Sequence, residues 1–329
     1  MIGIAITGHG SATPATIVSN EALSRVVETS DDWIRTRTGI QERRLASPDL
    51  SLTDLAAQAA QAAIVSGNLQ PTDLDLIILA TSTPDDLFGS AVAVQQRLGA
   101  TRAAAFDLTA ACSGFLFALV TAAQFIQNGT YQRVLVIGAD VLSRWVDWSD
   151  RGTCVLFGDG AGAIVLEASE TNHLLGFELR SDGSQNRCLN LAYQPDPHPL
   201  MPEVTLSQGR YHPITMNGKE VYRFAVQQVP EILEKALFRA GLTPDGVDWL
   251  LLHQANQRIL DAVAERLKIP QTKVLSNLAH YGNTSAATIP LMLDEAIRGG
   301  QVKPGDIVAA SGFGAGLSWG AAIFRYGRV

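Results

Sequence analysis

The 329-residue sequence predicts an α/β protein built from two pseudo-equivalent halves, and three observations lead to this fold class. Short apolar runs alternate with helical patterns, which is typical of mostly parallel sheets covered by helices. The pattern of the first half recurs in the second half at a nearly constant spacing. Hydrophobic residues make up 47% of the chain and charged residues only 17%, so much of the chain should be buried.

The repeat is clearest where a helix leads into a strand. Residues 53–80 read as an Ala-rich helix, a turn with Pro71 and an apolar strand, and residues 221–252 read as the same series with Pro244. The two prolines are 173 residues apart (244 − 71), and an aspartate follows each of them four residues later. Pro–Asp turns precede strands in many α/β chains, so the constant spacing is what favours a duplication.

Further matches extend the repeat beyond this helix and strand. Short strands are predicted at residues 104–108 and, one repeat later, at residues 273–278. Each is followed by a loop, a new helix and a third strand. We therefore expect one half to span residues 1–172 and the other to span residues 173–329.

Two stretches have no counterpart in the other half. Residues 141–153 stand alone, and residues 181–216, rich in Pro, Gly, His and Asn, read as a loop-rich insertion. Because long loops on a rigid scaffold often carry binding residues, we expect these stretches to contribute to a ligand site.

Composition and charge argue against several classes of protein. The net charge of −7 disfavours a general nucleic-acid binder, which would be basic. The start of the chain lacks the basic and apolar regions of a signal peptide, and the apolar run 114–126 is too short to cross a bilayer. Three cysteines without a CxxC pair or a Cys/His cluster favour neither disulfides nor a metal site. We expect a cytoplasmic protein that binds no metal, nucleic acid or membrane.

Cys112 is the first candidate catalytic residue. A predicted strand ends near Leu108, and a helix that is apolar on all sides begins near Ser113. Cys112 then lies at the start of a buried helix, where free amides and the helix dipole should lower the pKa of its thiol. The alternative is a buried and unreactive cysteine.

His253 and Asn283 are the second and third candidates. His253 follows an apolar strand, and ligands of open α/β sheets gather at the carboxyl ends of strands. Asn283 precedes a helix and lies 171 residues (283 − 112) after Cys112, within the range of the repeat. Each alone has an ordinary interpretation, a core histidine or a helix-capping asparagine. Together the three residues predict one site between the halves.

Two glycine-rich runs resemble dinucleotide-binding loops only superficially. Residues 158–162 and 312–316 each lead into an apolar, strand-like run, whereas a dinucleotide loop leads into a helix. Backbone amides of the second run are instead placed to donate to an oxyanion.

A tryptophan among arginines forms a candidate anion site in this acidic protein. An aromatic ring with several guanidinium groups suits adenine and phosphates. A solvated helix face is the ordinary alternative. The residues are Trp33, Arg35, Arg37, Arg43 and Arg44.

Six segments together resemble the β-ketoacyl-acyl-carrier-protein synthase III family of the thiolase superfamily. In chain order they are TSDDWIRTRTGI, DLTAACSGF, DRGTCVLFGDGAGA, HQANQRI, HYGNTSAA and GFGAGLSWG. The resemblance runs from the first predicted strand to the last. It implies the thiolase fold, in which two similar halves form layers in the order αβαβα.

The resemblance also implies a reaction and the residues that perform it. Cys112 accepts an acyl group from an acyl-CoA, by default acetyl-CoA, although branched or longer primers remain open. Malonyl-acyl-carrier protein then loses CO2 while His253 and Asn283 donate hydrogen bonds to the enolate, which attacks the acyl group. Backbone amides of Cys112 and Ala315 hold the oxyanion. The product is a 3-oxoacyl-acyl-carrier protein that begins fatty acid synthesis. No cofactor is tightly bound, because the CoA thioester is a substrate.

Binding residues follow from the same resemblance. Phe88 closes the acyl pocket of the other subunit, which implies a homodimer. The CoA contacts are Thr29, Trp33, Arg37, Arg151 and Asn256, and the acyl-carrier-protein contacts are Gln254, Arg258, Arg223 and Arg266.

Three other functions were weighed. A polyketide- or quinolone-type synthase of the same fold would share the triad and differ in the lining of its pocket. A papain-type Cys-His-Asn hydrolase has the same triad order, but the sequence lacks the CG[SA]C[WY] pattern of that family. A catalytically inactive binding module is disfavoured by the complete triad.

Overall fold

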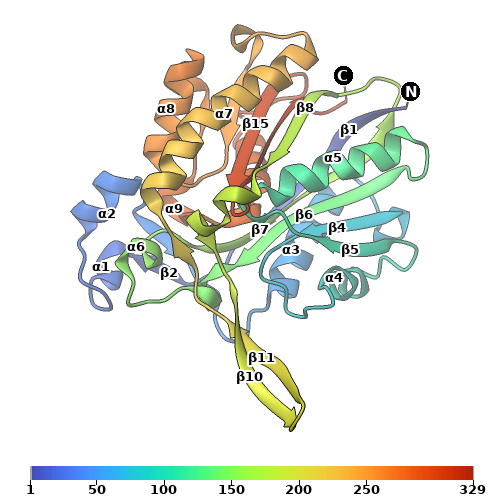
Figure 1. Ribbon diagram of the computed structural model, residues 1–329. Coiled ribbons are helices and arrows are strands. Elements are labelled where there is room, and N and C mark those ends of the chain that lie inside the picture. Colours follow the sequence, from blue (N-terminus) through green and yellow to red (C-terminus); the bar gives the residue numbers. More distant parts are fainter. Residues whose placement is uncertain (1, 329) are drawn as a thin grey trace.

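Two five-stranded sheets run through the molecule, with helices between them and on their outer faces (Figure 1). The computed structural model describes residues 2–328. In the first sheet, β4 is parallel to its neighbours β5 and β6, whereas β7 is antiparallel to β6 and β1. Its strands, in spatial order, are β1 (Gly3–Ala12), β7 (Asp159–Ser169), β6 (Arg133–Val141), β4 (Leu76–Ala80) and β5 (Ala104–Leu108).

The second sheet repeats this topology. β13 is parallel to β14 and β15, and β16 is antiparallel to β15 and β8, so each strand has a counterpart in the first sheet. The predicted α/β fold class with two like halves is confirmed, whereas the boundary at residues 172 and 173 stays a prediction. The strands are β8 (Leu174–Ser181), β16 (Ser318–Arg325), β15 (Ile307–Gly314), β13 (Trp249–Leu252) and β14 (Val274–Leu275).

Helices α5 (Gly114–Gln127) and α10 (Thr288–Arg298) form the middle layer, because each packs on strands of both sheets. Their sequences explain this position. Nearly every face of α5 is apolar, and consecutive residues of α10 from Thr288 to Asp294 are buried. A helix that is apolar all round is stable only when it is covered on all sides.

Amphipathic helices make the two outer layers. Helix α3 (Leu52–Ser66) packs on β1, β6 and β7, and α4 (Ala91–Leu98) on β4 and β5. Helix α7 (Gly218–Ala240) packs on β8, β15 and β16 and against α8 (Gln257–Leu267). The start of α3 is fixed by a capping box between Ser51 and Asp54, which satisfies amide groups that have no partner within the helix.

Short elements connect and decorate the layers. Two 3₁₀ turns, at Ala111–Ser113 and Ser285–Ala287, lead directly into α5 and α10. The remaining α-helices are α1 (Asn20–Leu23), α2 (Asp31–Thr38), α6 (Arg151–Cys154) and α9 (Leu278–Tyr281), and the remaining strands are β2 (Ile17–Ser19), β3 (Glu42–Arg44), β9 (Leu189–Asn190), β10 (Tyr193–Met201), β11 (Val204–Tyr211) and β12 (Thr215–Met216).

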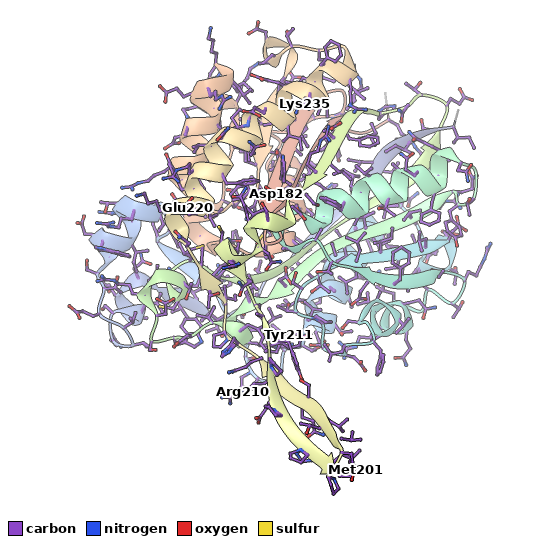
Figure 2. All side chains as sticks on the ribbon, viewed as in Figure 1. Asp182, Met201, Arg210, Tyr211, Glu220 and Lys235 are labelled. Carbon is purple, nitrogen blue, oxygen red and sulfur yellow. The ribbon has the colours of Figure 1, made fainter. Side chains whose placement is uncertain are left out.

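The insertion at residues 181–216 is more regular than the sequence predicted. It contains the hairpin of β10 and β11, which projects from the body of the molecule, with Met201 near its tip and Tyr211 at its base (Figures 1 and 2). The prolines of β10 stand at alternate positions, so their backbone nitrogens all face the same edge of the strand. The positions between them keep their N–H groups for hydrogen bonds to β11. They are Pro195, Pro197 and Pro199.

The strand predicted at residues 273–278 is also different. Only Val274–Leu275 pairs in β14, because the Oε1 atom of Gln254 accepts hydrogen bonds from the hydroxyl of Ser276 and the amide of Asn277.

Within residues 2–328 there is no helix of the length and apolarity that a bilayer crossing needs. The same part of the chain holds no group of three His, Cys, Asp or Glu side chains placed to bind a metal ion.

Glycine allows the middle layer to lie directly on the first sheet. A Cβ atom built on Gly138 of β6 would lie 2.2 Å from the carbonyl oxygen of Ala286, just before α10. This contact is between two backbones, so no flexible side chain can move aside. The position therefore accepts only glycine without a shift of α10.

We expect Gly138→Ala to lower the free energy of unfolding by about 1–3 kcal/mol or more, the usual cost of overpacking a core. Gly183→Ala is the matched control, because a Cβ atom there meets nothing within 4 Å. Urea unfolding of both variants measures the difference. Equal stability of the two variants would contradict the close contact.

Candidate functional site

Cys112 lies in the turn between β5 and α5, as its sequence position predicted. The preceding residue, Ala111, has a φ of 49°, a strained conformation for a non-glycine residue. The second sheet passes close to this turn. A Cβ atom on Gly314 of β15 would lie 2.6 Å from the backbone nitrogen of Cys112. The turn is therefore held between the two halves of the molecule.

A cavity of about 910 Å³ reaches Cys112. Most of its lining residues lie between Thr81 and Cys112, and apolar side chains from the β6–β7 connection and the insertion at residues 181–216 complete the walls. This volume is in the range of pockets that hold small organic ligands. The lining residues include Leu142, Trp145, Phe157, Leu189, Leu191 and Ile214.

His253 follows β13 and is 1% exposed. Its backbone amide donates to the carbonyl of Ser311 on β15 (2.8 Å), and its ring packs edge-on against Phe313, with ring centroids 5.4 Å apart. The Nδ1 atom lies 2.7 Å from the hydroxyl oxygen of Thr288. These contacts fix the ring and leave Nε2 without a hydrogen-bond partner among residues 2–328.

Asn283 is fixed by both its backbone and its side chain. Its amide donates to the carbonyl of Leu156 (2.8 Å), and its carbonyl accepts from the amide of Gly158 (3.0 Å). Its side-chain Oδ1 accepts from the amide of Ser285 at 2.8 Å. Because the oxygen is used in this bond, the NH2 group of the side chain remains as a donor.

Ser285 connects the three candidate residues. Its amide donates to Asn283, its carbonyl accepts from the hydroxyl of Thr288, which contacts His253, and its side chain opposes the rise in the pKa of the Cys112 thiol. Ser285 has a φ of 53° and lines the cavity with Cys112. His253 and Asn283 are not among the residues that line the cavity.

The pKa expected for Cys112 was wrong in direction. Burial raises the pKa of this thiol to about 12, and the carboxyl of Asp140 also raises it, while the bond from Ser285 opposes both. Loss of solvent around the sulfur therefore outweighs the helix start. Burial also lowers the pKa of His253 to about 3. Both side chains are neutral near pH 7.

The backbone predicted to hold an oxyanion lies at the cavity. Ala315, in the turn between β15 and β16, lines the same cavity as Cys112. The close packing of Gly314 on the Cys112 backbone brings this turn to the thiol. The roles of the two amides stay predictions.

The residues predicted to bind CoA gather around one indole ring. The guanidinium carbons of Arg37 and Arg151 lie 4.9 and 4.7 Å from the ring centre of Trp33. Arg151 donates to the carbonyl of Glu28 at 3.0 Å, and the buried hydroxyl of the neighbouring Thr29 has no partner among residues 2–328.

Asn256, also predicted to contact CoA, lies beside this ring. Asn256 caps α8 and donates to the carbonyl of Arg37 at 3.1 Å, which places it at the edge of the Trp33 group.

Arg43, which was expected to help bind an anion, is fully buried. Its guanidinium donates to Asn20 and to the carbonyls of Val18 and Val155, so it supports the fold and does not face a ligand.

Gln254 was wrongly predicted to contact a carrier protein. It is fully buried, its NH2 group donates to the carbonyls of Leu252 and Leu275, and its oxygen accepts two bonds. The three predicted arginines are exposed. Arg223 pairs with Glu220 and Arg266 with Glu231, whereas the guanidinium of Arg258 donates to the carbonyl of Thr36 and has no ion-pair partner among residues 2–328.

Phe88 is fully exposed in the single chain, yet it lines the cavity that contains Cys112. Its neighbour Leu87 is 81% exposed, and Phe106 on the edge strand β5 is 38% exposed. Exposed aromatic and aliphatic side chains in one region are typical of a surface that another protein covers.

Sequence reasoning missed three polar residues at the site. Ser285, Thr288 and the fully buried Asp140 have no motif of their own, and Ser and Thr are common at helix starts. Asp140 accepts hydrogen bonds from Thr81, Ser82 and other donors of this region. The one available signal was the position of Ser285 and Thr288, two and five residues after Asn283.

The raised pKa of Cys112 predicts how the thiol responds to pH. Below its pKa the thiolate fraction increases about tenfold per pH unit, so the rate of alkylation by iodoacetamide should rise steadily from pH 7 to pH 10. Mass spectrometry of the Cys112 peptide separates this reaction from those of Cys154 and Cys188. A rate that levels off below pH 8 would show a lowered pKa, and a free small thiol serves as the reference.

Comparison with known proteins agrees with this geometry. Family models described as 3-oxoacyl-[acyl-carrier-protein] synthase III match residues 106–183, and their C-terminal counterpart matches residues 237–326. The β-ketoacyl-[acyl-carrier-protein] synthase III of Trichormus variabilis is 68% identical over 99% of both chains. That of Synechococcus elongatus is also 68% identical, over 100% of this chain and 98% of the relative.

Solved structures show the same likeness. A 3-oxoacyl-[acyl-carrier-protein] synthase III from Aquifex aeolicus has a TM-score of 0.91 and 45% identity, covering 98% of this chain and 100% of the other. The priming β-ketosynthase of the R1128 polyketide pathway has a TM-score of 0.91 and 34% identity, covering 98% and 96%. The topology, the cavity at Cys112 and the identity over the full length lead to one conclusion: the chain belongs to the β-ketoacyl-[acyl-carrier-protein] synthase III family of thiolase-fold condensing enzymes.

Proposed function

We propose that the chain joins a short acyl group from acyl-CoA to malonyl-acyl-carrier protein, with loss of CO2, to form a 3-oxoacyl-acyl-carrier protein. This decarboxylative Claisen condensation would begin fatty acid synthesis. The observation that carries the proposal is the placement of Cys112 on an apolar cavity, with His253 and Asn283 linked to it through Ser285. A polyketide-type role is less favoured, because identity is 68% to named synthases III and 34% to the priming ketosynthase.

The first half-reaction transfers the acyl group to sulfur. As the bond from the Cys112 sulfur to the acyl carbon forms, Nε2 of His253 takes the thiol proton, and the acyl–CoA bond breaks. Burial disfavours a charged imidazolium, so the proton passes on to the departing CoA sulfur. Amides of Cys112 and Ala315 stabilise the tetrahedral oxyanion.

The second half-reaction uses the same groups as donors. The malonyl carboxylate leaves as CO2, and the electron pair moves to the thioester oxygen to form an enolate. Neutral His253 and the NH2 group of Asn283 donate hydrogen bonds to that oxygen, each contributing about 3–4 kcal/mol by analogy with known oxyanion donors. The enolate carbon then attacks the acyl-Cys112 carbonyl, and the sulfur leaves.

Variants of the triad should separate the two half-reactions. With acetyl-CoA, the wild-type protein should gain one acetyl group on Cys112, and Cys112→Ala should gain none. His253→Ala and Asn283→Ala should retain part of the acylation but release CO2 from malonyl-acyl-carrier protein about 10²–10³-fold more slowly, since each loses one enolate donor. Intact-protein mass and ¹⁴CO2 release are the measurements.

Two results would contradict these assignments. Acetylation that persists in Cys112→Ala would remove the proposed nucleophile. Normal CO2 release from both His253→Ala and Asn283→Ala would remove the proposed enolate donors. A panel of acetyl-, branched and longer acyl-CoAs in the same assay identifies the primer, for which acetyl-CoA is our proposal.

We place the adenine of CoA against Trp33, where Arg37 and Arg151 already stack on the indole. Arg151 would move outward so that the base enters between its guanidinium and the ring. The exposed guanidinium groups can hold the phosphates, and the unpaired hydroxyl of Thr29 can bond to the base. Asn256 would contact the pantetheine arm. CoA acts here as a substrate, and no tightly bound cofactor is proposed.

Arg258 is the arginine best placed to meet an acidic carrier protein, because Arg223 and Arg266 already pair with glutamates. We expect Arg258→Glu to raise the KM for malonyl-acyl-carrier protein several-fold while the KM for malonyl-CoA changes little. Lys303→Glu is the control. It makes the same charge change just before β15, at the end of that strand that lies far from Arg258. Equal effects of the two variants would contradict this docking site.

A homodimer completes the proposal. Phe88 would enter the acyl pocket of the second subunit, which explains why such a large apolar side chain is fully exposed in one chain. Light scattering of the purified protein tests this assembly. We place the enzyme in the cytoplasm, because Cys112, Cys154 and Cys188 are all unpaired and a reactive thiol needs a reducing compartment.

A further inference from the structure

The hydroxyl group of Thr288 lies between two groups that can each accept a hydrogen bond from it. Thr288 is the first residue of α10 and is 2% exposed. Its Oγ1 atom lies 2.7 Å from Nδ1 of His253 and 3.0 Å from the carbonyl oxygen of Ser285. Both distances are those of good hydrogen bonds.

One hydroxyl has one proton, so the two contacts determine the state of the imidazole ring. If Thr288 donates to Ser285, then Nδ1 of His253 must carry the proton and Nε2 is an acceptor. If Thr288 donates to Nδ1, then the proton of the ring is on Nε2, which is a donor. The direction of one hydroxyl therefore corresponds to the tautomer of the ring.

The surroundings favour neither direction strongly. The carbonyl of Ser285 already accepts the backbone amide of Thr288, so it remains paired when the hydroxyl turns away. Burial is the cause of the lowered pKa of His253, and Phe313 offers the ring only an aromatic contact. A carboxylate or a carbonyl at Nδ1 can only accept and would hold one tautomer, whereas a hydroxyl can accept or donate.

We propose that Thr288 is a positioning residue that allows His253 to present Nε2 as an acceptor during acylation and as a donor during decarboxylation. This inference rests on the proposed two-step function. The change between the steps moves one proton from Nδ1 to water and one from water to Nε2, with no net change. Water reaches the site when CoA leaves and before the second substrate enters.

Thr288→Val should impair the two steps unequally. Valine leaves Nδ1 without a partner, and a buried N–H without an acceptor is unfavourable. Nε2 is not among the fully buried atoms that lack a partner, so water can solvate an N–H at that position. The ring should then keep its proton on Nε2. Acylation of Cys112, which needs Nε2 as an acceptor, should slow about tenfold or more, while CO2 release by enzyme acylated beforehand should change about threefold or less. Thr288→Ser, which keeps the hydroxyl, should restore acylation.

A ¹⁵N NMR spectrum tests the tautomers without any substrate. In the wild-type protein both ring nitrogens of His253 should have shifts averaged between protonated and unprotonated values. In Thr288→Val they should separate into protonated Nε2 and unprotonated Nδ1, and Thr288→Ser should remain averaged. The signals are assigned by their loss in His253→Ala. Thr121→Val, which removes a hydroxyl bonded to the Phe117 carbonyl, is the control and should change neither readout.

Three outcomes would overturn the inference. They are a single fixed tautomer in the wild-type protein, an equal loss of both steps in Thr288→Val, and a failure of Thr288→Ser to restore acylation. If Thr288→Val does not fold, the wild-type spectrum and the serine variant still decide the question. If the wild-type protein does not condense the two substrates, the proposed function fails, and the spectrum alone still tests the tautomers.

Discussion

The site depends on the close approach of two buried helix starts to the backbones of the strands beside them. Gly138 of β6 lets Ala286 and the start of α10 lie on the first sheet, and Gly314 of β15 lets the Cys112 turn lie on the second. Neither contact leaves room for a side chain. The consequence is that Cys112 and the segment after Asn283 meet in the interior, although they come from opposite halves of the chain.

This burial determines the chemistry that the side chains can perform. Loss of solvent raises the pKa of the Cys112 thiol and lowers the pKa of His253, so the resting site contains neutral groups. In a site without charge, the direction of each hydrogen bond matters more than electrostatic attraction. Ser285 sets one of these directions through its amide, which donates to Asn283, while its carbonyl is one of two groups to which the Thr288 hydroxyl can donate.

The sequence predicted the fold well because the repeat is encoded in spacing and apolar periodicity. The turn at Pro71, the strand after it and their counterparts at Pro244 all lie where the pattern placed them. The errors arose where tertiary contacts override local pattern. The oxygen of buried Gln254 accepts from the Asn277 amide, which would otherwise extend β14. The alternate prolines of β10 favoured the prediction of a loop where the structure has a hairpin.

The site was predicted less completely for a related reason. Motifs identify residues whose type is rare at a position, such as a cysteine at a helix start, but hydroxyl residues at a helix start are common. What distinguishes Thr288 is a distance to a ring that lies 35 positions earlier in the chain, and no local pattern records that distance. The pKa of Cys112 was misjudged likewise, since the helix start is local and the burial is tertiary. A single helix end shifts a pKa modestly, whereas burial can shift it by several units, so burial decides the outcome here.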